Sequence, residues 1–360
     1  MRIAIDASRT TVARVTGTEY YSRELIRALI QRNTRHELHL YFRDTPPDDL
    51  FPSSPHVHQH VIPFPRLWTH VRFAWEITRT RPDVVFVPAH TLPFMFSGRA
   101  VVTVHDLGFR YFPEAHPLRD RLYLNLTTAY SARRAACVLA DSKATADDLT
   151  QIFGINAAKL HVVYPGVDAL PVGDIAAVRA KYGLPERYFL FLGTLQPRKN
   201  IAVIVQAYQR WRAANPADSA ELVLAGGKGW LYDDRWVSGV PGIHLPGYVD
   251  AADKGALYAG ALALVFPSLY EGFGFPVLEA MHCGTPVITS RTSSLPELAG
   301  DAALLADPLD VDAITQHMTN LARDDSLRQQ LRSRGYEQVR QFTWAHAAEQ
   351  TLQALEVAKL

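Results

Sequence analysis

The chain has little of what secreted, metal-binding or membrane-spanning proteins need. Only two of its 360 residues are cysteines, Cys137 and Cys283, and both stand in apolar surroundings, which favours buried thiols in a reducing compartment. Neither a Cys-x-x-Cys nor a His-Glu-x-x-His pattern occurs, so the sequence indicates no metal site. No apolar run approaches the roughly 18 residues of a membrane helix. The first residues already read as a strand, and we therefore expect a cytoplasmic protein.

A strong charge of either sign is also lacking. The 37 Lys and Arg residues nearly balance the 36 Asp and Glu residues, which gives a net charge of +1. Because nucleic-acid affinity depends on neutralising phosphates, this balance argues against a dedicated nucleic-acid binder. Residues 1–165 nevertheless carry 20 basic and 15 acidic side chains. That excess allows peripheral contact with the anionic inner face of a membrane, although solvated surface charge is the favoured alternative. The oligomeric state is not indicated.

The chain instead shows an alternation of strands and helices that is long enough for two domains. A single hydrophobic core stops growing at about 250–300 residues, and this chain is longer. Short apolar runs such as Ala100–Val104 and Tyr188–Leu192 are typical of parallel strands covered on both faces. We therefore predict an α/β protein with two doubly wound, Rossmann-like domains, residues 1–168 and 169–344.

The segment from Ser268 to Ala280 joins a strand to a helix through a loop suited to an anion. Ala261–Phe266 reads as the strand, while Gly272 and Gly274 let bare backbone approach a ligand. Pro276 suits the first helical position, where its missing N–H is not needed. The positive end of a helix dipole and its unpaired amides bind phosphate groups. We expect this role for the amides around Gly274, Phe275, Val277 and Leu278.

Two glutamates flank this phosphate seat. Glu271 lies on the loop and Glu279 lies about one turn inside the helix, so they cannot share one helix face. We expect them to contact different parts of one ligand. The alternative is that Glu279 only offsets the helix dipole and that Glu271 is a solvated loop charge.

This stretch resembles the Glu-x7-Glu motif of the retaining GT-B glycosyltransferases of glycosyltransferase family 4. The resemblance continues through 281–289 and 294–302 and covers most of the chain. It implies the GT-B fold, in which two Rossmann-like domains face a central cleft and the C-terminal helix, here 345–360, packs back on the first domain. It also implies that Glu271 holds the donor sugar and that Glu279 holds the ribose hydroxyls.

The same resemblance extends to a loop with two cations after the strand Tyr188–Leu192. The family has Gly-Arg followed by Lys on the diphosphate; Gly193 and Lys199 match, but Thr194 replaces the arginine. Arg198 either supplies the missing charge or the diphosphate seat is weaker. Two exposed basic residues without a ligand are the alternative. Further positions near the nucleotide would be Gly226 and Tyr248.

In the first half, the strand Ala100–Val104 ends in His105 and Asp106, at the edge where doubly wound folds bind ligands. The string resembles the His-Asp of the family, which implies that His105 donates to a sugar hydroxyl. Asp106 would either orient His105 or cap the next turn, and a buried histidine satisfied by the protein is the alternative. Gly17 stands alone where the family has paired glycines near the acceptor and donor phosphate, and a plain helix entry is equally open.

The resemblance implies a hexosyltransferase that uses a nucleoside diphosphate sugar and a glycan or lipid-linked glycan acceptor. The variant Gly193–Asn200 looks most like bacterial mannosyl- or rhamnosyl-type transferases of polysaccharide assembly, which favours GDP-mannose and leaves UDP- and dTDP-sugars open. The resemblance also implies that the anomeric configuration is retained. No carboxylate is an evident nucleophile, so we expect front-face displacement. We further expect that the reaction needs neither a metal nor a cofactor. The alternatives are a sugar-nucleotide epimerase of the same fold and a non-catalytic nucleotide-sugar-binding subunit.

Overall fold

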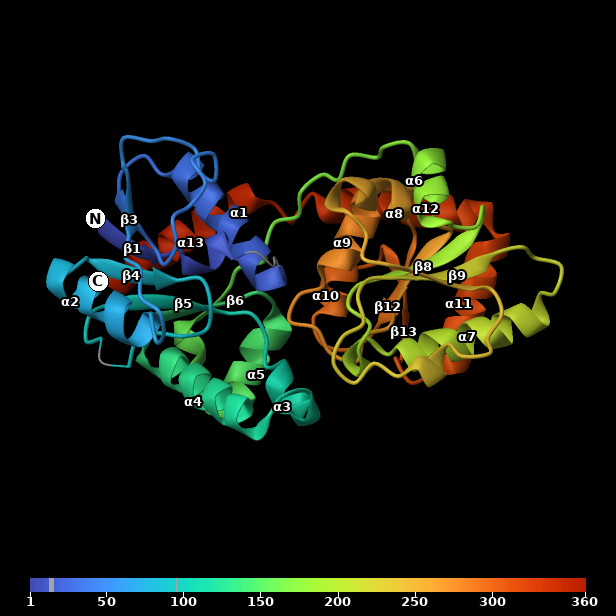
Figure 1. Ribbon diagram of the computed structural model, residues 1–360, viewed down its shortest axis with the longest axis horizontal. Coiled ribbons are helices and arrows are strands. Elements are labelled where there is room, and N and C mark those ends of the chain that lie inside the picture. Colours follow the sequence, from blue (N-terminus) through green and yellow to red (C-terminus); the bar gives the residue numbers. More distant parts are fainter. Residues whose placement is uncertain (13–15, 95) are drawn as a thin grey trace. The chain divides into compact units, whose positions relative to one another are not determined.

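The computed structural model describes residues 1–12, 16–94 and 96–360, which form two compact units. The first unit comprises Met1–Gly166 and Phe342–Leu360, and the second comprises Val167–Gln341 (Figure 1). The chain thus changes unit within two or three residues of the predicted limits at 168 and 344. The last helix, α13 (Trp344–Lys359), packs against α1 (Gly17–Arg32) of the first unit, as predicted for the C-terminal helix.

The first unit is built on a parallel sheet of seven strands in the order β3-β2-β1-β4-β5-β6-β7. Its central strands are buried along their whole length, as apolar runs covered on both faces should be. The strands are β1 (Arg2–Asp6), β2 (Glu37–Phe42), β3 (Val57–Val61), β4 (Val84–Val87), β5 (Ala100–Val104), β6 (Cys137–Ala140) and β7 (Leu160–Val162).

Helices cover both faces of this sheet. The chain crosses from β1 to β2 in one direction along the sheet and from β3 to β4 and from β5 to β6 in the other. Because such crossovers are right-handed, α1 lies on one face and the helices after β3 and β5 lie on the other. Residues of the latter helices share one core with β4, β5 and β6. The remaining helices are η1 (Ser8–Thr11), η2 (Thr69–Phe73), α2 (Ala74–Thr80), α3 (Gly108–Tyr111), η3 (Pro113–Ala115), α4 (Leu118–Arg134), α5 (Lys143–Phe153) and η4 (Ala157–Lys159).

The second unit repeats the plan with a parallel sheet of six strands in the order β10-β9-β8-β11-β12-β13. The two-domain α/β prediction is therefore confirmed. The strands of the second unit are β8 (Tyr188–Leu192), β9 (Glu221–Ala225), β10 (Ile243–Gly247), β11 (Ala263–Phe266), β12 (Val287–Ser290) and β13 (Ala303–Ala306). Its helices are α6 (Ile175–Tyr182), η5 (Pro197–Lys199), α7 (Ile201–Ala214), η6 (Asp234–Trp236), η7 (Ala251–Asp253), α8 (Lys254–Ala259), α9 (Phe275–His282), α10 (Leu295–Ala299), α11 (Val311–Arg323) and α12 (Asp325–Val339).

Among the helices that the structure describes, none is both long and apolar enough to cross a membrane.

Candidate functional site

Two loops of the second unit meet at the point where its strand order reverses. The chain leaves β8 toward β9 on one side and leaves β11 toward β12 on the other, so β8 and β11 flank the switch point where doubly wound folds bind ligands (Figure 1). The loop after β8 carries Arg198, and the loop after β11 carries Glu271. The Leu269 N–H donates to the Arg198 carbonyl at 2.9 Å, which ties the two loops together.

Asn200 fixes the geometry of this junction. Its φ of 62° lies in the left-handed region, which asparagine tolerates better than most residues. Its side-chain Nδ2 donates to the carbonyls of Pro267 at 3.1 Å and Pro308 at 2.6 Å. The residue thereby holds the ends of β11 and β13 against the start of α7. Its role was not predicted, because both of its partners are distant in sequence.

Three charged side chains form a cluster at the junction. Lys199 Nζ lies 2.5 Å from Glu271 Oε1, and Arg198 Nη1 lies 2.9 Å from Glu271 Oε2. The exposed fractions of the side chains are only 11% for Lys199, 19% for Arg198 and 8% for Glu271. Two largely buried cations therefore share one carboxylate. Two cations held close together in a poorly solvated place favour the approach of an anion.

The same cluster keeps Glu271 ionised. Burial raises the pKa of this carboxyl, but the charges of Arg198 and Lys199 outweigh burial and hold the pKa below its usual range. An ionised Glu271 cannot act as a general acid, but it can accept hydrogen bonds from hydroxyl groups. The prediction that Glu271 and the two cations belong to one site is thus matched by the geometry, while the role of each remains a prediction.

Neighbouring serines hold the loop that carries Glu271. The Glu271 N–H donates to Ser293 Oγ at 3.0 Å, and the Ser294 hydroxyl donates to the Glu271 carbonyl at 3.0 Å and to that of Phe273. Gly274 has a φ of 127°, and a Cβ there would lie 2.9 Å from Leu295 Cδ2, so only glycine suits this position. The serines belong to a segment that the family resemblance covered, but no hydrogen bond to the loop was predicted.

The start of α9 differs from the prediction in two details. Pro276 is the second residue of the helix, whereas the first position was predicted. The Val277 N–H, which was expected to be unpaired, donates to the Gly274 carbonyl at 3.0 Å. This bond forms because Gly274 makes a turn immediately before the helix. Whether the amides around Phe275 and Leu278 contact a phosphate stays a prediction.

Glu279 is held by α8. Its Oε2 accepts a hydrogen bond of 2.7 Å from the Tyr258 hydroxyl, and Lys254 Nζ lies 3.4 Å from its Oε1. Burial, and then the charge of Glu279, raise the pKa of Tyr258 well above its usual value, so that the hydroxyl remains a donor. Glu279 is therefore a fixed acceptor on a different element from Glu271, as their spacing predicted.

The other predicted positions of this unit lie at the ends of β8, β9 and β10. Gly226 has a φ of 132°, and a Cβ there would lie 2.0 Å from the Gly193 carbonyl oxygen, so the close approach of two strand ends requires glycine. Thr194 follows Gly193 directly. Tyr248 follows β10 and is 77% exposed. These residues share the sheet edge with the charge cluster, and their contacts with a nucleotide stay predictions.

In the first unit, His105 follows β5 and is 8% exposed. Its Nδ1 lies 2.7 Å from Asp141 Oδ2, and its Nε2 lies 2.9 Å from the Pro88 carbonyl oxygen. Since a carbonyl and a carboxylate both accept, the two ring nitrogens both donate. Burial lowers the pKa of His105, but the Asp141 charge outweighs burial and raises it. These contacts fit the alternative of a buried histidine whose hydrogen bonds are satisfied by the protein. To contact a sugar hydroxyl, Nε2 would have to give up its hydrogen bond to the Pro88 carbonyl.

The carboxylate that holds His105 is therefore Asp141, from the end of β6, and the expectation that Asp106 orients it needs correction. Asp106 Oδ1 accepts the Gly108 N–H at 2.7 Å, which is the turn-capping alternative. The parallel register pairs Val104 with Ala140, so the next residue of each strand, His105 and Asp141, lie side by side. Only this pairing could have pointed to Asp141.

His90, for which no role was predicted, lies beside His105. Its Nε2 accepts the His105 N–H at 3.1 Å, and its buried Nδ1 has no hydrogen-bond partner among the described residues. Burial lowers the pKa of His90 to about 3, so the ring is neutral at physiological pH.

Gly17 is the first residue of α1, as a plain helix entry predicts. Thr16, which precedes Gly17, forms a capping box with Glu19 of the first turn, in which the Thr16 N–H donates to Glu19 Oε2 at 3.1 Å. A direct role of Gly17 toward a ligand is not tested by this arrangement.

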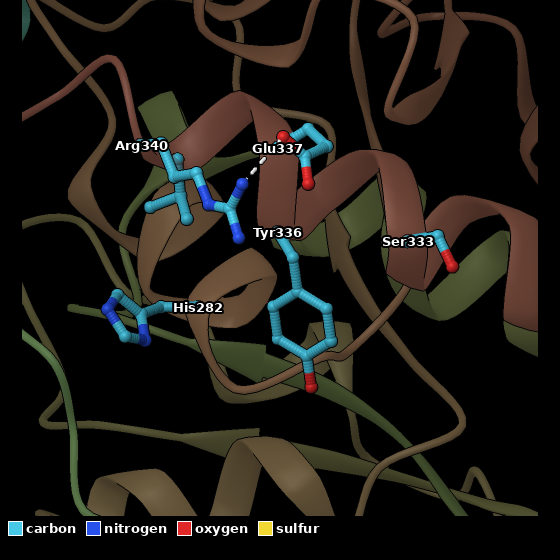
Figure 2. Close-up of a pocket in the computed structure, with 6 residues that line it drawn as sticks. His282, Ser333, Tyr336, Glu337 and Arg340 are labelled. Carbon is cyan, nitrogen blue, oxygen red and sulfur yellow. Dashed lines mark hydrogen bonds and ion pairs between the residues drawn. The ribbon is translucent and has the colours of Figure 1, made fainter.

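A separate pocket of about 430 Å³ lies at the other end of α9, against α12. Figure 2 shows His282, Tyr336 and Arg340 around it, with Arg340 Nη1 3.0 Å from Glu337 Oε2. None of the predicted site residues lines this pocket. Among the described residues, no group of three or more His, Cys, Asp and Glu side chains is placed to hold a metal ion.

Comparisons with known proteins find two family matches and similar proteins over nearly the whole chain. Residues 15–169 match Glycosyltransferase Family 4, and residues 174–338 match Glycosyl transferases group 1. The chain is 34% identical to the O-antigen chain mannosyltransferase B of Escherichia coli, over 95% of this chain and 96% of that protein.

Two solved structures share the fold. Sucrose-phosphate synthase from Thermosynechococcus elongatus has a TM-score of 0.74 and 23% identity, over 98% of this chain and 97% of that one. HepE from Anabaena, in complex with UDP and glucose, has a TM-score of 0.74 and 17% identity, over 99% of both chains. At such low sequence identities, the similarity to these two structures shows the fold alone.

Proposed function

The chain belongs to the GT-B glycosyltransferases of family 4, and from that premise we propose that it transfers mannose from GDP-mannose to a glycan or lipid-linked glycan. The similarity to an O-antigen chain mannosyltransferase supports the choice of mannose and of a bacterial polysaccharide as acceptor. In this proposal the second unit binds the donor and the first unit binds the acceptor.

The observation that carries the proposal is the gathering of two cations around Glu271. Arg198 and Lys199 both contact this ionised carboxylate, which lies a few residues before the start of α9. The diphosphate of a nucleotide would be attracted by the two cations, and helix N-termini favour the same group. Glu271 would then accept from hydroxyls of the sugar, and Glu279 from those of the ribose.

In the proposed reaction, the bond between the anomeric carbon and the diphosphate oxygen breaks while the acceptor oxygen bonds to that carbon on the same face. The acceptor proton passes to an oxygen of the leaving phosphate, so the anomeric configuration is retained without an enzymatic nucleophile. Arg198 and Lys199 would stabilise the negative charge that develops on the diphosphate. The reaction would need neither metal nor cofactor, so activity should persist in EDTA.

Replacing Lys199 tests the proposal. Transfer or hydrolysis of GDP-mannose by purified Lys199→Ala should be slower by about 100- to 1,000-fold, as for the loss of one transition-state donor. Lys228→Ala is the matched control, because Lys228 is an exposed lysine of the same unit that pairs with Asp234. Lys199→Arg should keep part of the activity. Wild-type turnover in a folded Lys199→Ala protein would refute the site, and donor binding without any turnover in wild type would support a binding-only subunit.

The donor can be identified separately from the acceptor. Thermal-shift measurements with GDP-, UDP- and dTDP-sugars report binding alone. A ligand that binds only the folded state stabilises it, and at equal concentration the ligand with the lower Kd stabilises it more. The largest shift is expected with GDP-mannose. A larger shift with a UDP- or dTDP-sugar would overturn the choice of base and leave the transferase proposal in place.

A further inference from the structure

Two helical segments of the first unit expose apolar side chains that normally face a core. Val71 and Trp75 lie four residues apart along η2 and α2 and are 46% and 58% exposed, and Leu67, just before η2, is 66% exposed. Leu118, Leu122 and Leu126 follow the same interval along α4, and are 61%, 59% and 62% exposed. Single exposed apolar residues are ordinary, but two regular stripes mark an interaction surface.

The two stripes belong to one surface, here called the α2–α4 surface. His70 Nε2 lies 3.0 Å from the Tyr123 hydroxyl, which joins η2 to α4. The His70 ring also stacks on Phe94, with 4.4 Å between ring centroids. Trp68 and Phe73 on one segment and Ala129 and Ala132 on the other share a single core. The segment that leads into α2 and the helix α4 lie side by side in Figure 1.

The two segments that form this surface are rich in arginine. Residues 66–81 contain four arginines and one acidic residue, and residues 110–126 contain three arginines and two acidic residues. The acidic residue of the first segment, Glu76, is buried and is already paired with Arg72 and Arg79. The guanidinium groups of both arginines also lie over the Trp75 ring, at 5.1 and 5.5 Å from its centroid. Together the two segments contain seven arginines and three acidic residues, so their net charge is +4.

Exposed apolar side chains together with arginines favour one of two possible binding partners, a second copy of the chain or an anionic bilayer. A second copy of the chain would bring two arginine-rich surfaces together, and like charges at short range repel. An anionic bilayer instead attracts arginine, while its interface accommodates tryptophan, tyrosine and leucine. Charge complementarity therefore favours the bilayer.

We propose that the α2–α4 surface docks this protein on a bilayer of anionic lipids. The α4 stripe begins at the carboxyl edge of the first sheet, because α4 follows β5 and the His105 turn. Docking there would bring the polar head of a lipid-linked acceptor to the edge that carries His105, a consequence that rests on the proposed function. The docking itself does not depend on it.

Sedimentation with lipid vesicles tests the docking. The wild-type protein should bind vesicles that contain phosphatidylglycerol about tenfold or more tightly than pure phosphatidylcholine vesicles, and added salt should weaken the binding. The triple variant Leu118→Gln, Leu122→Gln, Leu126→Gln should lose about tenfold or more of this binding, because it removes one apolar stripe. The matched triple variant Val172→Gln, Leu309→Gln, Val357→Gln should bind as wild type does. These residues are 52%, 71% and 55% exposed but lie outside the α2–α4 surface.

Three results would overturn the docking proposal. They are failure of the wild type to bind anionic vesicles, full binding by the α4 triple variant, and a wild-type dimer in light scattering that the α4 variant converts to monomer without any vesicle binding. Donor affinity, measured on the same proteins without vesicles, separates this proposal from the proposed function. Loss of vesicle binding with intact GDP-mannose binding supports docking, while vesicle binding without donor binding or turnover would refute only the transferase assignment.

Discussion

The carboxyl edges of the two sheets carry clusters of similar burial but of different charge balance. In the first unit, one histidine cation, His105, faces one carboxylate, Asp141, at 2.7 Å. In the second unit, two cations, Arg198 and Lys199, share Glu271. The described contacts of the first cluster thus pair one cation with one carboxylate, whereas those of the second gather two cations around one carboxylate.

The ratio of cations to carboxylates indicates which kind of ligand each edge suits. A buried cation that is paired with a carboxylate gains little from an incoming anion, while the pair can still exchange hydrogen bonds with hydroxyl groups. Two cations gathered around one carboxylate in a poorly solvated place favour the approach of an anion. The contrast therefore supports a diphosphate at the second unit and an uncharged acceptor group at the first.

The largest expected effect comes from removing the shared carboxylate. Glu271→Ala should slow transfer by about 100- to 1,000-fold, because contacts with the sugar are lost. Affinity for plain GDP should not fall, since the carboxylate that competes with the diphosphate for Arg198 and Lys199 would be gone. Steady-state kinetics and calorimetric titration with GDP measure the two quantities. A large loss of GDP affinity in this variant would contradict the proposed division of roles.

Glu279→Ala provides the contrasting variant at the same site. It should weaken GDP binding by about tenfold, because ribose contacts persist in the product complex. Tyr258 would also lose its acceptor at 2.7 Å. Equal GDP affinity in wild type and Glu279→Ala would rule out the ribose assignment.

A smaller effect is expected from unbalancing the first unit. Asp141→Asn should reduce the free energy of unfolding by about 3 kcal/mol, because a buried cation loses its partner. The pKa of His105, followed by NMR, should also fall below its usual range, since burial lowers it once the Asp141 charge is gone. Asp106→Asn is the control and should cost less than about 1 kcal/mol, because asparagine can still cap the Gly108 N–H. Equal effects of the two changes would contradict the assignment of Asp141 as the partner of His105.

Local sequence patterns were sufficient for the fold and for the main members of the charge cluster. Apolar runs and glycine turns located the strands, and the loops that carry Lys199 and Glu271 both follow strands at the switch point. The family resemblance added the separate roles of Glu271 and Glu279. These residues were predictable because each lies a few positions from a strand end that the sequence itself marks.

What stayed hidden depends on contacts between residues distant in sequence. Asp141 reaches His105 through the pairing of β5 with β6, and Asn200 reaches Pro308 across the sheet. Ser293 bonds the Glu271 amide because its own φ of 52° turns the chain toward the loop. A single sequence does not show strand order or backbone angles, so such partners could not be named in advance.

The smallest effect concerns His60, a histidine whose pKa is lowered rather than raised. His60 Nε2 lies 2.9 Å from His39 Nδ1, and its ring stacks on Tyr41 at 4.8 Å. Burial lowers the pKa of His60, and the charge of His58 lowers it further, against an opposing effect of Glu76. Unlike His105, whose raised pKa favours folding at low pH, His60 is more easily protonated in the unfolded chain. Its contribution to stability is therefore present above pH 6.5 and is lost as the pH falls below that value.

His60→Gln should consequently make the free energy of unfolding less sensitive to acid. Between pH 7 and pH 5 the wild type should lose up to about 1 kcal/mol more than the variant, and partial exposure of the ring keeps the difference small. Denaturant unfolding at both pH values measures it, with His346→Gln as control because His346 is exposed on α13. If the variant loses as much stability as the wild type on acidification, the lowered pKa of His60 is not what makes this strand pair acid-sensitive. The effect of neighbouring charges would then be established only for the carboxyl edges of the two sheets.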